Sequence, residues 1–179
     1  MKRVAFALLV GVFVFALAIS PTTAGSERFI VKGQVSWQGH GPAGTPKWEQ
    51  FIWVTLDYQN PVYGCMVKTG VWGEFACDFP SGLALPFWIE VHNGHTLSVK
   101  VKVLGSSTVN VGTLIAGDAT QDNKIDKADL ELCEWMMGSV CPVGGSCYLA
   151  ADINDDQAVT RADCDLITAN LGMEGPIRR

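Results

Sequence analysis

One twelve-residue pattern occurs twice in the C-terminal third of the chain, as DATQDNKIDKAD at residues 118–129 and as DINDDQAVTRAD at residues 152–163. In both copies, oxygen-bearing side chains fall at positions 1, 3, 5, 9 and 12, and an aliphatic residue falls at position 8. This spacing is typical of a calcium-binding loop, in which the main-chain carbonyl at position 7 adds a further oxygen. Its occurrence twice in matched register favours an ion site over a solvated acidic loop, which is the alternative.

The pattern therefore predicts two bound calcium ions, one in each loop. The aspartates within each copy repel one another unless a cation lies among them, so ion binding should drive the folding of this region. The candidate metal ligands are Asp118, Thr120, Asp122, the carbonyl of Lys124, Asp126 and Asp129 in the first loop, and Asp152, Asn154, Asp156, the carbonyl of Ala158, Thr160 and Asp163 in the second.

Each loop is followed by a segment with helical periodicity. A glycine, Gly138 or Gly172, ends each segment at the same point of the repeat. Residues 109–117 have a strand-and-turn sequence, so no helix is expected to enter the first loop, unlike an ordinary EF-hand. The two apolar stripes are expected to pack on each other. They consist of Leu130, Cys133 and Met137 in the first copy and of Cys164, Ile167 and Leu171 in the second.

These two loop-helix repeats resemble the type I dockerin family over residues 117–176. The resemblance implies the ligands given above and a cohesin domain as partner, bound through loop positions 10, 11, 17 and 18; the alternative is that this face contacts the adjoining β domain. Position 6, usually glycine, holds Asn123 and Gln157, so we expect more backbone strain in the second loop. The implied partner-binding residues are Lys127, Ala128, Glu134 and Trp135 in the first copy and Arg161, Ala162, Thr168 and Ala169 in the second.

Charge divides the chain sharply near residue 117. Residues 25–117 carry six acidic and six basic side chains, whereas residues 118–179 carry twelve acidic and five basic ones. This shift predicts a domain boundary, with a β-sandwich domain over residues 25–116 and a calcium-binding module over residues 117–179. The excess of negative charge argues against nucleic acid as a partner.

The first of these regions has the pattern of β structure. Residues 29–37 and 51–58 are rich in β-branched and aromatic residues, residues 97–103 alternate between apolar and polar, and turn signals divide the region into about seven short strands. We therefore predict a mixed multidomain fold, an N-terminal all-β antiparallel sandwich plus a small all-α calcium-binding module. KTGVWGEF at 68–75, with FPSG at 79–82 and FWIEV at 87–91, resembles carboxypeptidase regulatory-like or transthyretin-like sandwiches of secreted bacterial proteins.

The N-terminus has the features of a secretory signal over residues 1–24. Lys2 and Arg3 precede an uncharged run over residues 4–19, which is short for a membrane span, and small residues follow at 22–24. We expect a secreted or cell-surface protein with no transmembrane segment after cleavage. In an oxidising environment the six cysteines predict three disulfides, for which 15 pairings are possible. The favoured pairings are Cys65 with Cys77, Cys133 with Cys164, and Cys141 with Cys147.

The sequence shows no catalytic set, because the three histidines lack neighbouring carboxylates or cysteines in a metal or nucleophile arrangement. We expect a noncatalytic protein for assembly or attachment. The alternative is a carbohydrate-binding β-sandwich, with the calcium module acting as a structural terminator in cis. Of the tryptophans that could stack on sugar rings, Trp72 lies in a glycine turn and is expected to be exposed, whereas Trp37, Trp53 and Trp88 are expected in the core.

Overall fold

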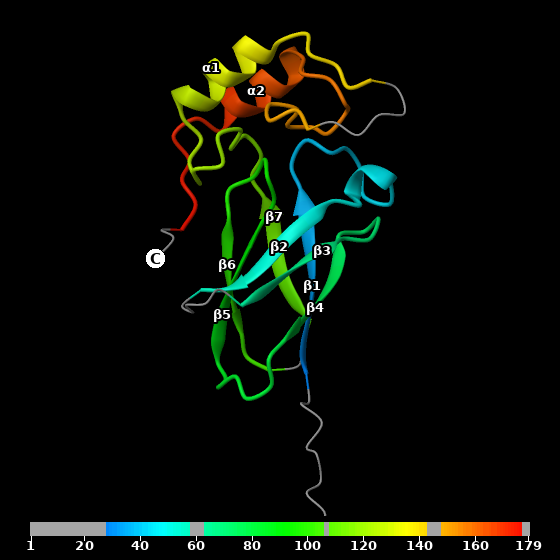
Figure 1. Ribbon diagram of the computed structural model, residues 1–179, viewed down its shortest axis with the longest axis vertical. Coiled ribbons are helices and arrows are strands. Elements are labelled where there is room, and N and C mark those ends of the chain that lie inside the picture. The colour runs from blue at the N-terminus through cyan, green and yellow to red at the C-terminus, as the bar shows by residue number, and fades with distance from the viewer. Residues whose placement is uncertain (1–27, 58–62, 106–107, 143–147, 177–179) are drawn as a thin grey trace, which may run out of the picture.

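A computed structural model describes residues 28–57, 63–105, 108–142 and 148–176 (Figure 1). The predicted signal, residues 1–24, lies outside these ranges. None of the helices within them is long and apolar enough to cross a membrane. The elements are β1 (Phe29–Trp37), a 3₁₀ turn η1 (Pro46–Trp48), β2 (Phe51–Leu56), β3 (Gly64–Lys68), β4 (Glu74–Phe79), β5 (Phe87–His92), β6 (Val99–Val103), β7 (Val109–Leu114), α1 (Lys127–Met136) and α2 (Arg161–Ala169).

The strands form two sheets that pack face to face. One sheet has the order β4-β1-β7 and the other has the order β3-β2-β5-β6. All the paired strands are antiparallel except β1 and β7, which run parallel and shift register between Gln34 and Val35. The expectation of an all-antiparallel sandwich is therefore wrong, because the last strand, β7, lies parallel to the first strand, β1, at the edge of the three-stranded sheet.

Period-two alternation fills the space between the sheets. In β2, the side chains of Ile52, Val54 and Leu56 are buried, whereas those of Phe51 and Trp53 point outward. β4 and β1 alternate in the same way, and the inward residues form one apolar core. Burial of each such side chain stabilises the fold by about 1.5–3 kcal/mol.

Two tryptophans expected in this core lie on its outer surface instead. Trp37 is buried, but 39% of Trp53 and 43% of Trp88 is exposed. Each outward tryptophan follows an inward residue, Ile52 or Phe87, so the strand pleat directs it to the opposite face. High apolar content around a position did not reveal which side of the sheet it occupies.

The two helices lie together across one end of the sandwich (Figure 1). They are ten and nine residues long, and the core beneath them includes Leu97 and Ala116 from the β region. The predicted mixed multidomain fold with a small all-α module is therefore wrong: the chain is mostly β-sandwich with two short helices, and Leu97 and Ala116 of the β region complete the small core beneath them. This small core is a cluster apart from the larger one between the two sheets.

Two disulfides join the residues that the sequence paired. Cys65–Cys77 links β3 to β4 across the two sheets, and Cys133–Cys164 links α1 to α2. Both half-cystines between the helices are almost fully buried. The third predicted pair includes Cys147, which lies outside the described residues.

Candidate functional site: the two acidic loops

The first aspartate of each loop holds the loop closed through main-chain N–H groups. Asp118 accepts hydrogen bonds from the N–H groups of Asp122 and Asn123, each at 3.0 Å. Asp152 accepts equivalent bonds from Asp156 and Gln157, at 3.0 and 2.8 Å. The matched register of the repeat thus gives matched structure in both loops.

The last aspartate of each loop joins the loop to its helix. Asp129 accepts from the N–H and hydroxyl of Thr120 through Oδ1 and from the N–H of Asp126 through Oδ2. Asp163 accepts from the N–H groups of Asn154 and Thr160 in the same way. Because Asp129 and Asp163 are fully buried, these bonds offset part of the cost of removing each carboxylate from water.

Position 9 of each loop caps the helix that follows. Asp126 accepts from the Ala128 N–H at 2.7 Å, and the Thr160 hydroxyl oxygen accepts from the Ala162 N–H at 3.3 Å. Asp129 and Asp163, at position 12, accept in return from the N–H of the position 9 residue, and the two sets of bonds form a capping box at the start of each helix. The side chains at position 9 are therefore helix caps in this structure, as well as members of the predicted ligand set.

Each loop pairs with the segment that follows the helix of the other repeat. The main chain of Ile125 bonds with Gly172 and Met173, whereas that of Val159 bonds with Gly138 and Ser139. Both glycines have a φ of +84°, a left-handed conformation that favours glycine. The glycines that were predicted to end the helices thus also place the segment after each helix against the loop of the other repeat.

The loops contain left-handed backbone at positions 4 and 6. Asn123 and Gln157 at position 6 have φ values of +68° and +73°, and Gln121 and Asp155 at position 4 have +63° and +56°. Glutamine and aspartate in this region cost free energy relative to glycine. The strain at position 6 was predictable, because glycine is usual there in such loops. No such residue preference marks position 4 in the sequence.

Burial perturbs the first carboxylate of each loop. Desolvation raises the pKa of Asp118 and that of Asp152 to about 6, against the opposing effect of the N–H groups that each accepts from. Neighbouring acids, Asp129 for Asp118 and Asp155 for Asp152, raise each pKa further. Ionising either group in the folded chain therefore costs free energy, which a nearby cation would offset.

Carboxylates alone do not make a metal cluster here. Within the described ranges, no three His, Cys, Asp or Glu side chains converge as a possible metal site. One carboxylate oxygen of Asp122 and one of Asp156 each accept a hydrogen bond from the main-chain N–H two residues later. An oxygen of Asp126 accepts from the first turn of α1. Calcium in these loops would also need hydroxyl, amide and main-chain oxygens. One such oxygen, Oδ1 of Asn154, is buried with no hydrogen-bond partner in this part of the chain.

The side of the loops that faces the sandwich is fastened to it by buried amides. Asn123 accepts from the N–H and hydroxyl of Ser98, at 2.7 and 2.9 Å, and donates to the carbonyl of Pro176. Asn170, at the end of α2, donates to Gln38 and to the Ala116 carbonyl, both at 2.8 Å. These contacts between distant segments could not be inferred from the loop pattern.

The residues implied as partner-binding all lie on exposed positions. Trp135 is 81% exposed on α1, away from the sandwich core. The alternative, in which it lies against the β domain, does not hold. The exposed set comprises Lys127, Ala128, Glu134, Trp135, Arg161, Ala162, Thr168 and Ala169.

Two histidines at the base of the loops, His40 buried and His95 half-buried, should make stability depend on pH. Burial lowers the pKa of His40 and of His95, although Asp155 opposes the shift in both; the Nδ1 of His95 lies 3.1 Å from the Ala150 carbonyl oxygen. The unfolded chain takes up these protons near pH 6.5 and the folded chain at lower pH. The free energy of unfolding should therefore fall as the pH drops below about 6.5.

Denaturant titrations between pH 7.5 and 5 would measure this dependence. Because the raised pKa values of Asp118 and Asp152 act in the opposite sense, the wild type should be compared with His95→Gln at each pH. The stability difference between the two proteins should shrink on acidification. A stability difference between the two proteins that stays constant from pH 7.5 to 5 would contradict a lowered pKa of His95 in the folded chain.

Comparisons with known proteins add evidence on the fold. No family model and no curated protein matches the sequence. Two solved structures of Acetivibrio cellulolyticus proteins are similar, with TM-scores of 0.58 and 0.59 at 14% and 16% identity. Each match covers 82% of this chain and 97% of the other chain. Both belong to type II Cohesin-X-Dockerin complexes.

This finding corrects the resemblance drawn from the sequence. The similar structures come from type II complexes, so the assignment to a type I dockerin module behind a carboxypeptidase regulatory-like or transthyretin-like sandwich is wrong. The structure agrees, because it is mostly a β-sandwich, with two short helices across one end. At this level of identity the likeness establishes the fold alone.

Proposed function

We propose that this chain is a secreted, noncatalytic protein that takes part in extracellular protein assembly through the outer faces of α1 and α2. The observation that carries the proposal is the division of the helical region into two sides. Its inner side is fastened to the sandwich by Asn123 and Asn170, whereas all eight candidate binding residues lie on exposed positions. An exposed tryptophan among charged residues is typical of a protein-binding hot spot.

The kind of complex in the similar structures supports an assembly role. They are complexes in which cohesin and dockerin components are joined, and the present chain shares the fold. The partner that we propose is a protein domain of this class of complex. The sequence led to a cohesin-type partner, and a binding experiment that offers cohesin-type and dockerin-type domains separately distinguishes the two.

We further propose that each loop binds one calcium ion. The burial of Asp118 and Asp152 and the raised pKa of each support this proposal. So does the buried Oδ1 of Asn154, which has no hydrogen-bond partner among the residues that the structure describes. A bound calcium ion supplies positive charge that stabilises the ionised carboxylates. The chain's own part is to hold the loops closed through Asp118 and Asp152 and to start both helices at the capping boxes of positions 9 and 12.

The test of the assembly role is capture of the purified chain by immobilised cohesin-type and dockerin-type domains. We expect one kind to capture it in calcium and to release it in chelator, because the loops position the helices. Trp135→Ala should weaken this capture by about tenfold or more. Trp72→Ala removes an equally large exposed side chain from the sandwich and should leave capture unchanged. Failure of both kinds of domain to bind, or equal effects of the two substitutions, would contradict the proposal.

A further inference from the structure

The outer face of the four-stranded sheet carries exposed aromatic side chains. Phe51, Trp53 and Trp88 are 53%, 39% and 43% exposed, because the pleat of β2 and β5 directs them away from the core. On the neighbouring strand, Met66 lies opposite Trp53 and is also exposed. Lys102 places its ammonium 5.9 Å from the centre of the Trp88 ring. Exposed aromatic side chains grouped on one face are a common feature of ligand-binding surfaces.

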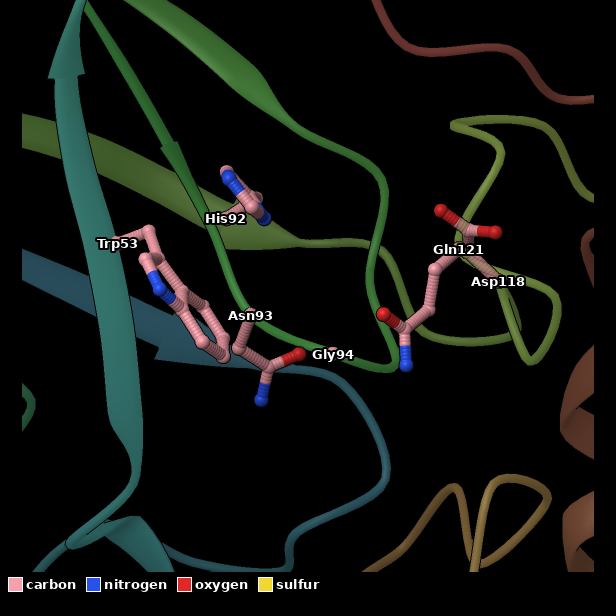
Figure 2. A pocket seen from close by; sticks show the side chains of 6 residues that line it. All are labelled: Trp53, His92, Asn93, Gly94, Asp118 and Gln121. Atoms are coloured by element: carbon pink, nitrogen blue, oxygen red, sulfur yellow. The ribbon is translucent and has the colours of Figure 1, made fainter. Parts of the chain in front are cut away.

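A cavity of about 150 Å³ lies where this face meets the first acidic loop. Figure 2 shows Trp53 on one side of it and two residues of the loop on the other. The Trp53 ring stacks on the ring of His92, with centroids 5.5 Å apart and an interplanar angle of 13°, and this contact fixes its orientation. The cavity is lined by Trp53, His92, Asn93, Gly94, Asp118 and Gln121.

The polar groups of the cavity are held by bonds of their own. The Asn93 side-chain oxygen accepts from the His95 N–H at 2.9 Å, and the Gln121 amide donates to the Tyr148 hydroxyl. Tyr148 in turn stacks on His95, with ring centroids 5.3 Å apart. Amide groups therefore stand at set positions around an aromatic wall, which is the arrangement expected of a small-ligand site.

We propose that this cavity binds one sugar ring of a neutral polysaccharide, stacked on Trp53. The C–H face of a pyranose is apolar and packs on an aromatic ring, and its hydroxyls match the mixed donors and acceptors of the Asn93 and Gln121 amides. None of the residues that line the cavity is a lysine or an arginine that would pair with the carboxylate of a uronic acid, which favours a neutral sugar. The volume suits a single ring, and it is smaller than the roughly 300 Å³ at which pockets for drug-sized ligands begin.

The sheet beyond the cavity provides a path for the rest of the polysaccharide. Trp88 precedes His92 by four residues on β5, a separation of about 13 Å along the strand. The chain would pass over this exposed face toward Trp88. This site is separate from the outer faces of α1 and α2, so it can be tested independently of the assembly role.

The test is titration calorimetry of the full chain with cellohexaose, xylohexaose and mannohexaose, with oligogalacturonate as an anionic comparison. At least one neutral hexaose should bind, and Trp53→Ala should raise its dissociation constant about tenfold or more. Trp53→Phe should retain most of the affinity, which separates stacking from damage to the fold. Trp72→Ala, an exposed tryptophan outside the cavity, should bind like the wild type.

Three results would overturn the proposal. They are the absence of binding by every neutral hexaose, tighter binding of oligogalacturonate than of any neutral sugar, and loss of affinity in Trp72→Ala equal to that in Trp53→Ala. Unfolding midpoints measured for each variant establish that the proteins compared are folded.

Discussion

Asp152→Ala should lower the calcium affinity of the second loop by about a hundredfold or more, since changes to residues behind metal ligands alone reduce affinity by 10- to 100-fold. Asp152 is buried, and it holds the N–H groups of Asp156 and Gln157. The substitution therefore removes a proposed ligand and a support of the loop together. Titration calorimetry with calcium would measure the loss, and Asp118→Ala should have the same effect in the first loop.

Asp155→Ala is the matched control for this experiment. It removes one negative charge from the same loop, at a position outside the proposed ligand set, where the side chain instead accepts a hydrogen bond from Gln50. We expect a much smaller loss of affinity than in Asp152→Ala. Equal losses in the two variants would mean that general negative charge, and not the ligand spacing, attracts the ion.

Removing the disulfide between the helices should have the largest effect on stability. Cys133 and Cys164 lie 31 residues apart in sequence, and a crosslink over such a loop stabilises a protein by about 3–4 kcal/mol. The double variant Cys133→Ala/Cys164→Ala should lose about this much free energy of unfolding, and the small cavities left by two buried sulfur atoms add to the loss. Urea titration in saturating calcium would measure it.

The same variant tests how the disulfide and calcium share the task of ordering the helices. In chelator, the oxidised wild type should loosen but keep helical circular dichroism, because the crosslink holds α1 against α2. The double variant should lose this helical signal in chelator. As a control, Cys65→Ala/Cys77→Ala removes the disulfide of the sandwich and should keep the helical signal. A wild type that becomes fully random coil in chelator would contradict this account.

Local patterns predicted the local structure well. The stretch rich in β-branched and aromatic residues at 29–37 is β1, and the alternating stretch at 97–103 contains β6. The repeated loops begin helices at matched positions with matched caps. Such features depend on residues close together in sequence, and their physical causes, alternation and capping, can be read from it. The disulfide between the helices could be anticipated because both cysteines fall on apolar stripes.

Long-range arrangement was where prediction from sequence failed. The parallel pairing of β1 with β7 joins segments more than 70 residues apart, and no local pattern specifies it. Leu97 and Ala116 of the β region complete the core under the helices, so the helical region is not an all-α fold by itself. A shift in surface charge reports solvent-facing residues, whereas the extent of a core depends on buried contacts.

In the candidate sites too, local features could be predicted from the sequence, whereas contacts with distant segments could not. Asn123 was considered for its backbone conformation, but its side chain also bonds to Ser98 and Pro176. Trp53 was assigned to the core from its apolar neighbours, whereas it forms the wall of a cavity together with the first loop. In both cases the partner comes from a distant segment, so only the folded chain reveals the role.

The most direct test of the central proposal is the calcium stoichiometry of the purified, oxidised full chain, measured by titration calorimetry at neutral pH after removal of bound metal by chelator. The account predicts two ions per chain, with one fewer in Asp118→Ala and one fewer in Asp152→Ala. Uptake of no calcium at millimolar concentration, or uptake that is the same in the wild type and in both variants, would contradict it.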